Sequence, residues 1–527
     1  MSRRRITCRR GAVALAALLA CLGSAACGGS GASVGRFATT SSHRRPKVAG
    51  AGAAATTTTQ RRMSPSRAQV AIPDGDWPQF GYTDQRSDVG PSDTGIDAAN
   101  LPELRRRTVR LPATADSSAV YLHDVRVEGR RRDAIFLTTS YGRTLAIDPA
   151  SGRVLWQFTP RDIGAYAGSY RFTTATPTVD PDRRYLYATS PDGYVHKLAV
   201  ATGRPLWAAR VTLNPQREKL ASPPSIAGGW LIVVTGGYYG DTPPYQGHVV
   251  AIDRASGRIE AVFNTLCSNR RGLIRPSSCA ASDSAIWGRA GAVIEPDGKI
   301  LVATGNGPFN GRTDWGDSVL ELSRSLRLAH NFTPRDQAQL QADDLDLGST
   351  SPALLPDPGG PPLAVQGGKS GELLLLDLDR LDGSSGRAGP RTGGQLQTIA
   401  APGRAPVFAQ PAAWEHGGRS YLFVADGAGT ACYELGRDRR LHVAWEAAMP
   451  GTSPVLAGGL LYVYDELGGT LAVRNPLSGR LLGRLPAAPG HWNSPIVLGG
   501  RIILPVGGGP GRESSPGLLY IYHLPGR

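Results

Sequence analysis

The chain has 527 residues, of which 67 are glycine and 41 are proline, and its formal charge is +15. This glycine and proline content excludes a mainly helical protein, and a hydrophobic share of 41% excludes a chain that is disordered throughout. The charge does not indicate a nucleic-acid partner, because residues 1–73 hold 12 Arg or Lys and no Asp or Glu, which leaves 46 basic against 43 acidic residues in 74–527. We therefore expect no nucleic-acid binding, and an all-β protein with many tight turns.

Residues 1–27 have the layout of a secretory signal, with a basic start, an apolar middle and small residues before Cys27. The end of this segment resembles the lipobox of bacterial lipoproteins, in which a cysteine after small residues is acylated. We predict that Cys27 carries a lipid anchor, so that the protein is extracytoplasmic and bound to the cell membrane. Acylation of Cys21, plain secretion without a lipid anchor, and an uncleaved N-terminal anchor are the alternatives.

Residues 28–73 are rich in Gly, Ala, Ser, Thr and Arg and show no periodic apolar positions. Such a segment cannot bury enough apolar surface to offset the entropy lost on ordering. We expect a disordered low-complexity tether here, followed by one folded region over 74–527. The basic residues of the tether would also suit anionic lipid headgroups beside an anchor.

Three cysteines lie beyond the leader and the tether. Cys267 and Cys279 would close a 12-residue loop, and outside the cytoplasm we expect them to form a disulfide. Cys432 lies in a strand-like run and is predicted to be a buried thiol. No Cys-x-x-Cys-His motif occurs, so the sequence predicts no covalently attached c-type haem.

A short motif recurs along the folded region. One copy consists of Ala134–Thr139, Thr144–Asp148 and Val154–Trp156, three strand-like runs joined by two glycine-containing turns. Seven further copies follow, at Tyr185–Trp207, Leu231–Phe263, Ile300–Phe332, Leu363–Gly383, Tyr421–Trp445, Leu460–Leu485 and Ile502–Leu524. Each is preceded by an additional strand that usually opens with Ser or Thr and Pro, which makes four strands per unit.

A four-stranded unit cannot bury both of its apolar faces alone, but units stacked radially cover each other. The sequence therefore predicts an eight-bladed β-propeller of four-stranded antiparallel blades. The last copy supplies only three strands, so we expect Leu104–Leu111 to add the fourth and close the ring. Trp156, Trp207 and Trp445 recur at one position of the repeat and are predicted to pack between blades.

The recurring segment Ala146–Trp156 and the opening Asp76–Gly81 resemble the pyrroloquinoline quinone (PQQ) repeat propellers. The resemblance covers about residues 74–527. This family contains quinoprotein alcohol dehydrogenases, and it also contains non-catalytic members such as the propeller lipoprotein of the outer-membrane barrel assembly machinery. The resemblance thus implies either PQQ and Ca²⁺ on the propeller axis or a protein-binding scaffold.

For the enzyme, the resemblance implies a set of site residues. Asn306, which ends a Thr-Gly-Asn strand, matches a calcium ligand, and Lys369 matches the residue that contacts the quinone oxygens. Asp344 is the first choice for the catalytic base and for a metal ligand, and Asp346 is the second choice for the base. Trp287 lies near the position of the tryptophan on which the cofactor stacks.

The sequence departs in two places from the pattern of the quinoprotein dehydrogenases, so the protein-binding scaffold stays an alternative. The adjacent cysteines that cap the cofactor in many of these enzymes are missing from Gly168–Phe172. The acidic calcium ligand of the third unit is not recognisable, unless Asp241 has taken its place. The expected partner on the axis is thus either a small alcohol or a protein of the cell envelope.

Overall fold

The computed structural model describes residues 71–358, 360–381, 392–509 and 515–526. The predicted signal segment with Cys27 lies outside these residues, and so does the predicted tether as far as residue 70. The chain divides into two units, Met1–Met63 and Ser64–Arg527, and everything described here belongs to the second.

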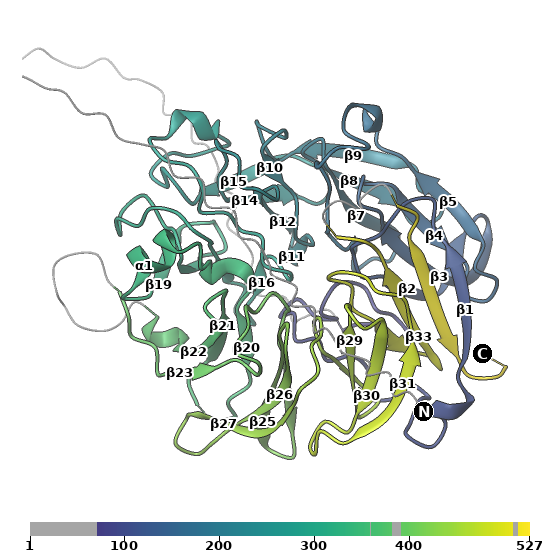
Figure 1. Ribbon diagram of the computed structural model, residues 1–527. Helices are drawn as coiled ribbons and strands as arrows, with labels where there is room; N and C mark the ends of the chain where they lie inside the picture. The colour runs from purple at the N-terminus through teal and green to yellow at the C-terminus, as the bar shows by residue number, and fades with distance from the viewer. Residues whose placement is uncertain (1–70, 359, 382–391, 510–514, 527) are drawn as a thin grey trace, which may run out of the picture. The chain divides into compact units, whose positions relative to one another are not determined.

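Within the described residues, eight four-stranded antiparallel sheets form the blades of a propeller (Figure 1). Blade 1 contains β2 (Val120–Val127), β3 (Arg130–Thr138), β4 (Thr144–Ile147) and β5 (Val154–Phe158), and blade 2 contains β6 (Thr178–Val179), β7 (Tyr185–Ser190), β8 (Tyr194–Ala199) and β9 (Pro205–Arg210). Blade 3 contains β11 (Ser225–Ala227), β12 (Trp230–Val234), β14 (His248–Asp253) and β15 (Ile259–Asn264), and blade 4 contains β16 (Val293–Ile294), β17 (Ile300–Ala303), β18 (Val319–Leu322) and β19 (Leu328–Phe332).

The second half of the ring repeats this plan. Blade 5 contains β20 (Ala353–Leu355), β21 (Leu363–Gly367), β22 (Glu372–Asp377) and β23 (Gln397–Ala400), and blade 6 contains β24 (Ala412–His416), β25 (Arg419–Ala425), β26 (Thr430–Leu435) and β27 (Leu441–Ala447). Blade 7 contains β28 (Val455–Ala457), β29 (Leu460–Asp465), β30 (Thr470–Arg474) and β31 (Leu481–Pro486), and blade 8 contains β32 (Ile496–Leu498), β33 (Arg501–Val506), β34 (Leu518–His523) and β1 (Arg105–Arg110). The eightfold repeat predicted from the sequence is therefore confirmed.

The last blade is completed by the start of the folded region. β1 pairs with β34 in antiparallel register, with Arg105 opposite His523 and Arg110 opposite Leu518. The outer strand of blade 8 thus comes from upstream of blade 1, as predicted. This pairing closes the ring, because the strand that completes blade 8 continues along the chain into blade 1.

Regular structure outside the blades is sparse. A two-stranded sheet joins β10 (Glu218–Lys219) to β13 (Gly236–Gly237), and α1 (Gln337–Ala342) is the one α-helix of the described residues. The part of the chain that the structure describes also contains five 3-10 turns, at Leu101–Glu103, Ile163–Ala165, Pro276–Ser278, Leu347–Ser349 and Leu378–Arg380. None of the helices in the described residues has the length and apolar composition needed to cross a lipid bilayer.

The predicted cysteine pairing is present. Cys267 and Cys279 form a disulfide with their Cα atoms 6.1 Å apart, in the long connection between blades 3 and 4. Cys432 is fully buried in β26 as a free thiol. The disulfide therefore stabilises an irregular segment that has few sheet hydrogen bonds of its own.

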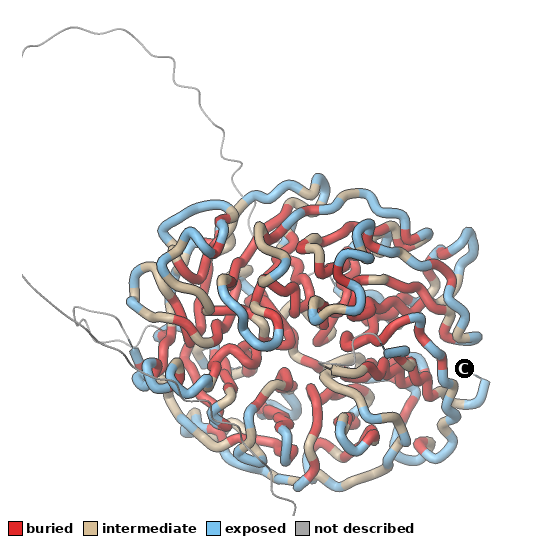
Figure 2. Tube along the Cα trace, turned by 45° about the horizontal axis from the view of Figure 1, so that its top comes forward, coloured by how far each residue is buried: buried red, intermediate tan, exposed pale blue. Residues whose placement is uncertain are grey.

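Apolar side chains of neighbouring blades pack against each other. Along the backbone, the exposed residues lie mostly at the periphery and the buried residues mostly inside (Figure 2). The recurring tryptophans are part of this packing. Trp156 of blade 1 donates its indole N–H to the carbonyl of Val200 in blade 2 at 2.9 Å. A Cβ atom at Gly203 of blade 2 would lie 2.5 Å from the Trp156 ring. The turn of one blade thus accommodates the tryptophan of the blade before it, as the repeat predicts.

The substitution Gly203→Ala is expected to destabilise the propeller by about 2–4 kcal/mol, because it combines overpacking against Trp156 with a backbone φ of +69°. Gly129→Ala is the matched control, since Gly129 has a φ of +76° and no other atom lies within 4 Å of the place that its Cβ would take. The control is expected to lose only about 1 kcal/mol. Denaturant unfolding measures both, and equal losses would contradict the packing role of the glycine.

The segment 76–96 lies along the inner strands at one end of the central channel. Trp77 pairs with Tyr121 of β2, and backbone amides of five other blades donate to this segment. These donors are Val179 to Pro78, Ile294 to Asp84, Ala413 to Ser87, Leu456 to Asp88 and Gly500 to Thr94. The segment therefore covers this end of the channel. We call the opposite end of the channel, where the inner strand of each blade begins, the hub.

Candidate functional site

The structure brings the five predicted site residues together at the hub, although they come from four separate segments. Trp287 lies before β16, Asn306 follows β17, Asp344 and Asp346 lie between α1 and β20, and Lys369 follows β21. All of these positions are in the connections that face the hub. Blades 4 and 5 thus supply the polar part of the site.

Lys369 is the centre of this group. Its Nζ lies 3.1 Å from Asp344 Oδ1 and also pairs with Asp346 Oδ2. The same Nζ lies 5.7 Å from the centre of the Trp287 ring, within the range of a cation–π contact. Burial lowers the pKa of Lys369, but the two carboxylates outweigh it and raise the pKa above its ordinary value.

Asn306 joins the same network through two of its atoms. Its side-chain Nδ2 donates to Asp344 Oδ1 and its backbone N–H donates to Asp346 Oδ1, both at 2.7 Å. Its side-chain Oδ1 is buried and has no hydrogen-bond partner. A Cβ at the preceding Gly305 would lie 2.1 Å from Asp346 Oδ1, so glycine is required there for the aspartate to approach.

The side chains of the two predicted aspartates, Asp344 and Asp346, differ in how far they are exposed to solvent. The side chain of Asp344 is 72% exposed, whereas that of Asp346 is 10% exposed. Asp346 is held by Asn306 and Lys369, so its position is set by the protein. Asp344 is the carboxylate that an incoming molecule can reach.

Further acidic residues surround this network. Asp241, which the sequence left as an alternative calcium ligand, and Asp283, which it did not single out, both have a raised pKa, first because of burial and also because of the charges of Asp344 and Asp346. The hydroxyl of Tyr245 donates to Asp241 Oδ1 at 3.1 Å. The site therefore holds more carboxylates than the sequence alone indicated.

Asp317 is the deepest of these carboxylates. It is fully buried, and it accepts hydrogen bonds from the backbone of Leu347 at 3.1 Å and from Gln337 at 3.4 Å. Burial raises its pKa to about 7, and the charge of Asp346 acts in the same direction. The neutral form of Asp317 is therefore populated near neutral pH.

Four aspartates of the site have a left-handed backbone. Their φ angles are +43° for Asp241, +88° for Asp283, +46° for Asp317 and +56° for Asp344. Aspartate tolerates this region better than most residues, and such conformations gather at functional sites. This signal is not visible in the sequence, because any loop aspartate can take either conformation.

Three aromatic rings form the other side of the hub. Trp287 lies 6.0 Å from Phe408 and 6.0 Å from Trp492, and Phe408 and Trp492 lie 5.8 Å apart, measured between ring centres. These residues precede the inner strands of blades 4, 6 and 8, so they meet at the centre of the ring. All three are half-buried, and they offer a partly exposed aromatic surface. Phe408 and Trp492 were not predicted from the sequence, although both stand close to the Pro that opens an inner strand.

The available atoms partly match a PQQ and Ca²⁺ site. The free Asn306 Oδ1 and the accessible Asp344 carboxylate are the oxygen donors that Ca²⁺ prefers, and Lys369 with Trp287 suits a planar ligand that carries oxygens. Among the residues that the structure describes, no three His, Cys, Asp or Glu side chains are arranged to hold a metal ion.

The sequence of this chain is similar to those of several known proteins. Residues 111–328 match the family described as outer membrane protein assembly factor BamB. The dehydrogenase subunit of a quinone alcohol dehydrogenase from Gluconacetobacter polyoxogenes is 27% identical over 43% of this chain and 30% of its own length. The quinohemoprotein alcohol dehydrogenase ADH IIB from Pseudomonas putida is 26% identical over 48% of this chain and 38% of its own length. The chain thus matches less than half of the length of these curated relatives.

Solved structures show the same fold. The quinohemoprotein alcohol dehydrogenase from Comamonas testosteroni has a TM-score of 0.63 at 15% identity, covering 86% of this chain and 81% of its own. BamB from Moraxella catarrhalis has a TM-score of 0.50 at 14% identity, covering 80% of this chain and 99% of its own. The repeat, the blades and these matches agree on the fold: the chain is a β-propeller that resembles the PQQ-repeat proteins.

Proposed function

We propose that this propeller is a quinoprotein that binds PQQ with Ca²⁺ at the hub and oxidises an alcohol there. The observation that carries the proposal is the convergence of Trp287, Asn306, Asp344 and Lys369 on one another across separate segments. Curated relatives named as quinone-dependent alcohol dehydrogenases support the same function.

Each residue has a distinct task in this proposal. Trp287 would support the plane of the cofactor, and Lys369 would donate hydrogen bonds to its oxygens. Asn306 Oδ1 and Asp344 would hold Ca²⁺, and an Asp344 or Asp346 oxygen would accept the proton of the alcohol. When bound, PQQ supplies the electron acceptor and Ca²⁺ polarises the reacting carbonyl. Asp344 is favoured as the base because it is the exposed carboxylate.

We place the protein outside the cytoplasm. The Cys267–Cys279 disulfide suits an oxidising compartment, and relatives of the family include an outer membrane protein assembly factor. The lipid anchor at Cys27 is part of this proposal, with plain secretion as its alternative. Some relatives are quinohemoproteins, but the sequence contains no Cys-x-x-Cys-His motif, so covalent haem is not part of it.

The test is titration of the purified protein with PQQ in the presence and absence of Ca²⁺, followed by quinone absorbance and by dye reduction with short alcohols. Ca²⁺-dependent binding of PQQ and alcohol-dependent reduction are expected. Asn306→Ala should weaken the Ca²⁺-dependent binding of PQQ at least tenfold, whereas Asn331→Ala in β19 should not change this binding. Absence of PQQ binding to the folded wild-type protein would refute the proposal.

A second candidate is a non-catalytic scaffold that binds an envelope protein at the hub face. It is favoured by one feature of the site: Lys369 already neutralises both predicted aspartates, which leaves less charge for a metal ion. Exposed aromatic residues, Tyr239 at 76% and Tyr170 at 49%, also suit a protein contact. Capture of an envelope protein that fails on Tyr239→Ser, without PQQ binding by the wild type, would support this candidate.

A further inference from the structure

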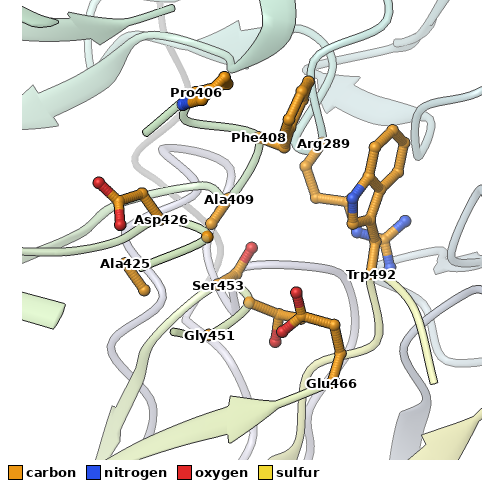
Figure 3. Close-up of a pocket in the computed structure, with 12 residues that line it drawn as sticks. Arg289, Pro406, Phe408, Ala409, Ala425, Asp426, Gly451, Ser453, Glu466 and Trp492 are labelled. Carbon is orange, nitrogen blue, oxygen red and sulfur yellow. The ribbon is translucent and has the colours of Figure 1, made fainter. Parts of the chain in front are cut away.

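Charged residues of both signs meet at the hub, whereas the outer side of the ring carries charge of one sign at one place. The hub cavity of about 50 Å³ beside Phe408 and Trp492 is lined by Arg289 and also by Asp426 and Glu466 (Figure 3). The outer strands of the eight blades contain six arginines, two glutamates and no lysine or aspartate, and four of these arginines are in β1. The positive charge of the outer side is therefore concentrated on blade 8.

β1 presents its arginines to the blades on both of its sides. Side chains of a strand alternate between two sides, so Arg106 and Arg107 point in opposite directions. Arg106 Nη1 donates to the carbonyl of Pro486 in blade 7 at 2.9 Å, and Arg107 Nη1 donates to the carbonyl of Pro149 in blade 1 at 3.2 Å. β1 thus lies on the outer side of the ring between blades 7 and 1 (Figure 1).

Other arginines of this surface have no partner. Arg105 and Arg110 are exposed, and within the described residues neither side chain makes a hydrogen bond or an ion pair. Arg484, the one charged residue of β31 in blade 7, is also exposed and unpaired in this part of the chain. We call the surface formed by Arg105, Arg106, Arg107, Arg110 and Arg484 the basic rim.

The neighbouring blade 1 shows that this protein can neutralise exposed arginines. Three of its arginines each pair with a carboxylate, in the pairs Arg131–Asp124, Arg132–Asp148 and Arg153–Glu128. No arginine of the basic rim has a carboxylate partner among the residues that the structure describes. Neighbouring charges in β1 lie within the Debye length of about 8 Å, so they repel each other. The basic rim therefore indicates a counter-charge from outside the chain.

Protection of a sheet edge does not account for four arginines in one strand. Each outer strand is the open edge of its blade, and charged side chains discourage pairing with another chain. The other seven outer strands contain at most one Arg, Lys, Asp or Glu each, and β5, β19 and β23 contain none. One charge or none thus suffices for edges of similar length in this protein, and the remaining charge of β1 needs another cause.

The chemistry of the basic rim indicates its partner. Guanidinium groups bind phosphate oxygens in bidentate fashion, and clusters of basic residues bind anionic lipid surfaces. Nucleic acid fits less well, because residues 74–527 are nearly neutral, with 46 basic against 43 acidic residues. A lipid anchor at Cys27 would hold the propeller next to a bilayer, where weak contacts gain from a high local concentration. We propose that the basic rim docks on a membrane surface that carries anionic phospholipids, with blade 8 against the bilayer.

Sedimentation with lipid vesicles tests this proposal. Every protein in the test carries Cys27→Ser, so that no acyl chain contributes, and residues 28–73 are the same in all. Binding is expected to vesicles that contain phosphatidylglycerol but not to vesicles of phosphatidylcholine alone, and added salt should weaken it. Each arginine near such a surface contributes about fivefold to the affinity, so the triple variant Arg105→Gln, Arg110→Gln and Arg484→Gln should bind at least tenfold more weakly.

The matched control is the triple variant Arg271→Gln, Arg327→Gln and Arg437→Gln, which removes the same charge from exposed positions outside blades 7, 8 and 1. It should bind the vesicles as the parent protein does. Absence of binding by the folded parent, a folded rim variant that binds as the parent does, or equal losses in the two triple variants would overturn the proposal. Binding of the parent to heparin but not to the vesicles would assign the basic rim to a soluble polyanion and would also overturn membrane docking.

Discussion

Lys369→Met is expected to weaken PQQ binding about thirtyfold and, at the same time, to make the stability of the protein depend on Ca²⁺. Lys369 neutralises Asp344 and the mostly buried Asp346, so its removal leaves an unpaired carboxylate. Breaking such a pair costs about 3–5 kcal/mol when the remaining charge stays buried. Loss of charge-assisted hydrogen bonds to the quinone oxygens, worth about 2 kcal/mol, accounts for the loss in affinity.

The Ca²⁺ dependence follows from the same geometry. In the wild-type protein the Lys369 ammonium competes with any cation for Asp344 and Asp346. In Lys369→Met the two carboxylates and the free Asn306 Oδ1 are left for Ca²⁺, so Ca²⁺ alone should bind at least tenfold more tightly than to the wild type. Thermal unfolding with and without Ca²⁺, and calorimetry with PQQ, measure the two effects separately.

Lys299→Met is the control for this experiment. Lys299 also joins two carboxylates, at 2.8 Å from Glu321 and 3.2 Å from Asp297, but it lies in blade 4 away from the hub. This variant should lose stability without losing PQQ affinity. Equal PQQ binding by Lys369→Met and the wild type would contradict the assignment of Lys369 as a cofactor contact.

The blades and the contents of the hub differ in how far the sequence predicts them. Strand alternation, turn glycines and the recurring Trp156 position depend on contacts within one repeat or between adjacent repeats, and they are readable from spacing alone. The closure of the ring by β1 follows from counting strands in the last copy. These features are local or repeat periodically, so they were predicted correctly.

The hub is different because its contacts join blades that are distant in sequence. Trp492 stacks near Trp287 only when the ring is closed, and Arg289 donates a hydrogen bond to the carbonyl of Thr174 two blades away. Irregular loops carry these residues, and a loop has no periodicity that indicates where a side chain points. The predicted residues Asn306, Asp344 and Lys369 were accessible to sequence reasoning only through the family resemblance, whereas Arg289 and Asp283 required the structure.

A further prediction concerns how the stability of the protein depends on pH, through Glu295, a residue outside the hub. Glu295 is 5% exposed and its Oε1 has no hydrogen-bond partner. Burial and then the charge of the neighbouring Glu321 raise its pKa to about 8. Glu321 is itself fully buried, and it pairs with Lys299 at 2.8 Å.

The sign of the pH dependence follows from the raised pKa. Because Glu295 has a higher pKa in the folded than in the unfolded protein, its favourable contribution is complete below about pH 4.5 and is lost as the pH rises to about 8. At about 1.4 kcal/mol per pH unit, this contribution amounts to a few kcal/mol over that range. The free energy of unfolding should therefore fall between about pH 5 and pH 8.

Glu295→Gln should remove this fall, because a glutamine amide donates to Glu321 at every pH as the protonated acid does. The variant is expected to match the wild type near pH 5 and to be more stable by about 2 kcal/mol or more at pH 8. Denaturant unfolding at several pH values measures the difference, with the exposed Glu415→Gln as the control that should keep the wild-type slope. If Glu295→Gln retained the wild-type slope, ionisation of Glu295 beside Glu321 would not be the cause of the fall, because the variant has no proton to lose at this position.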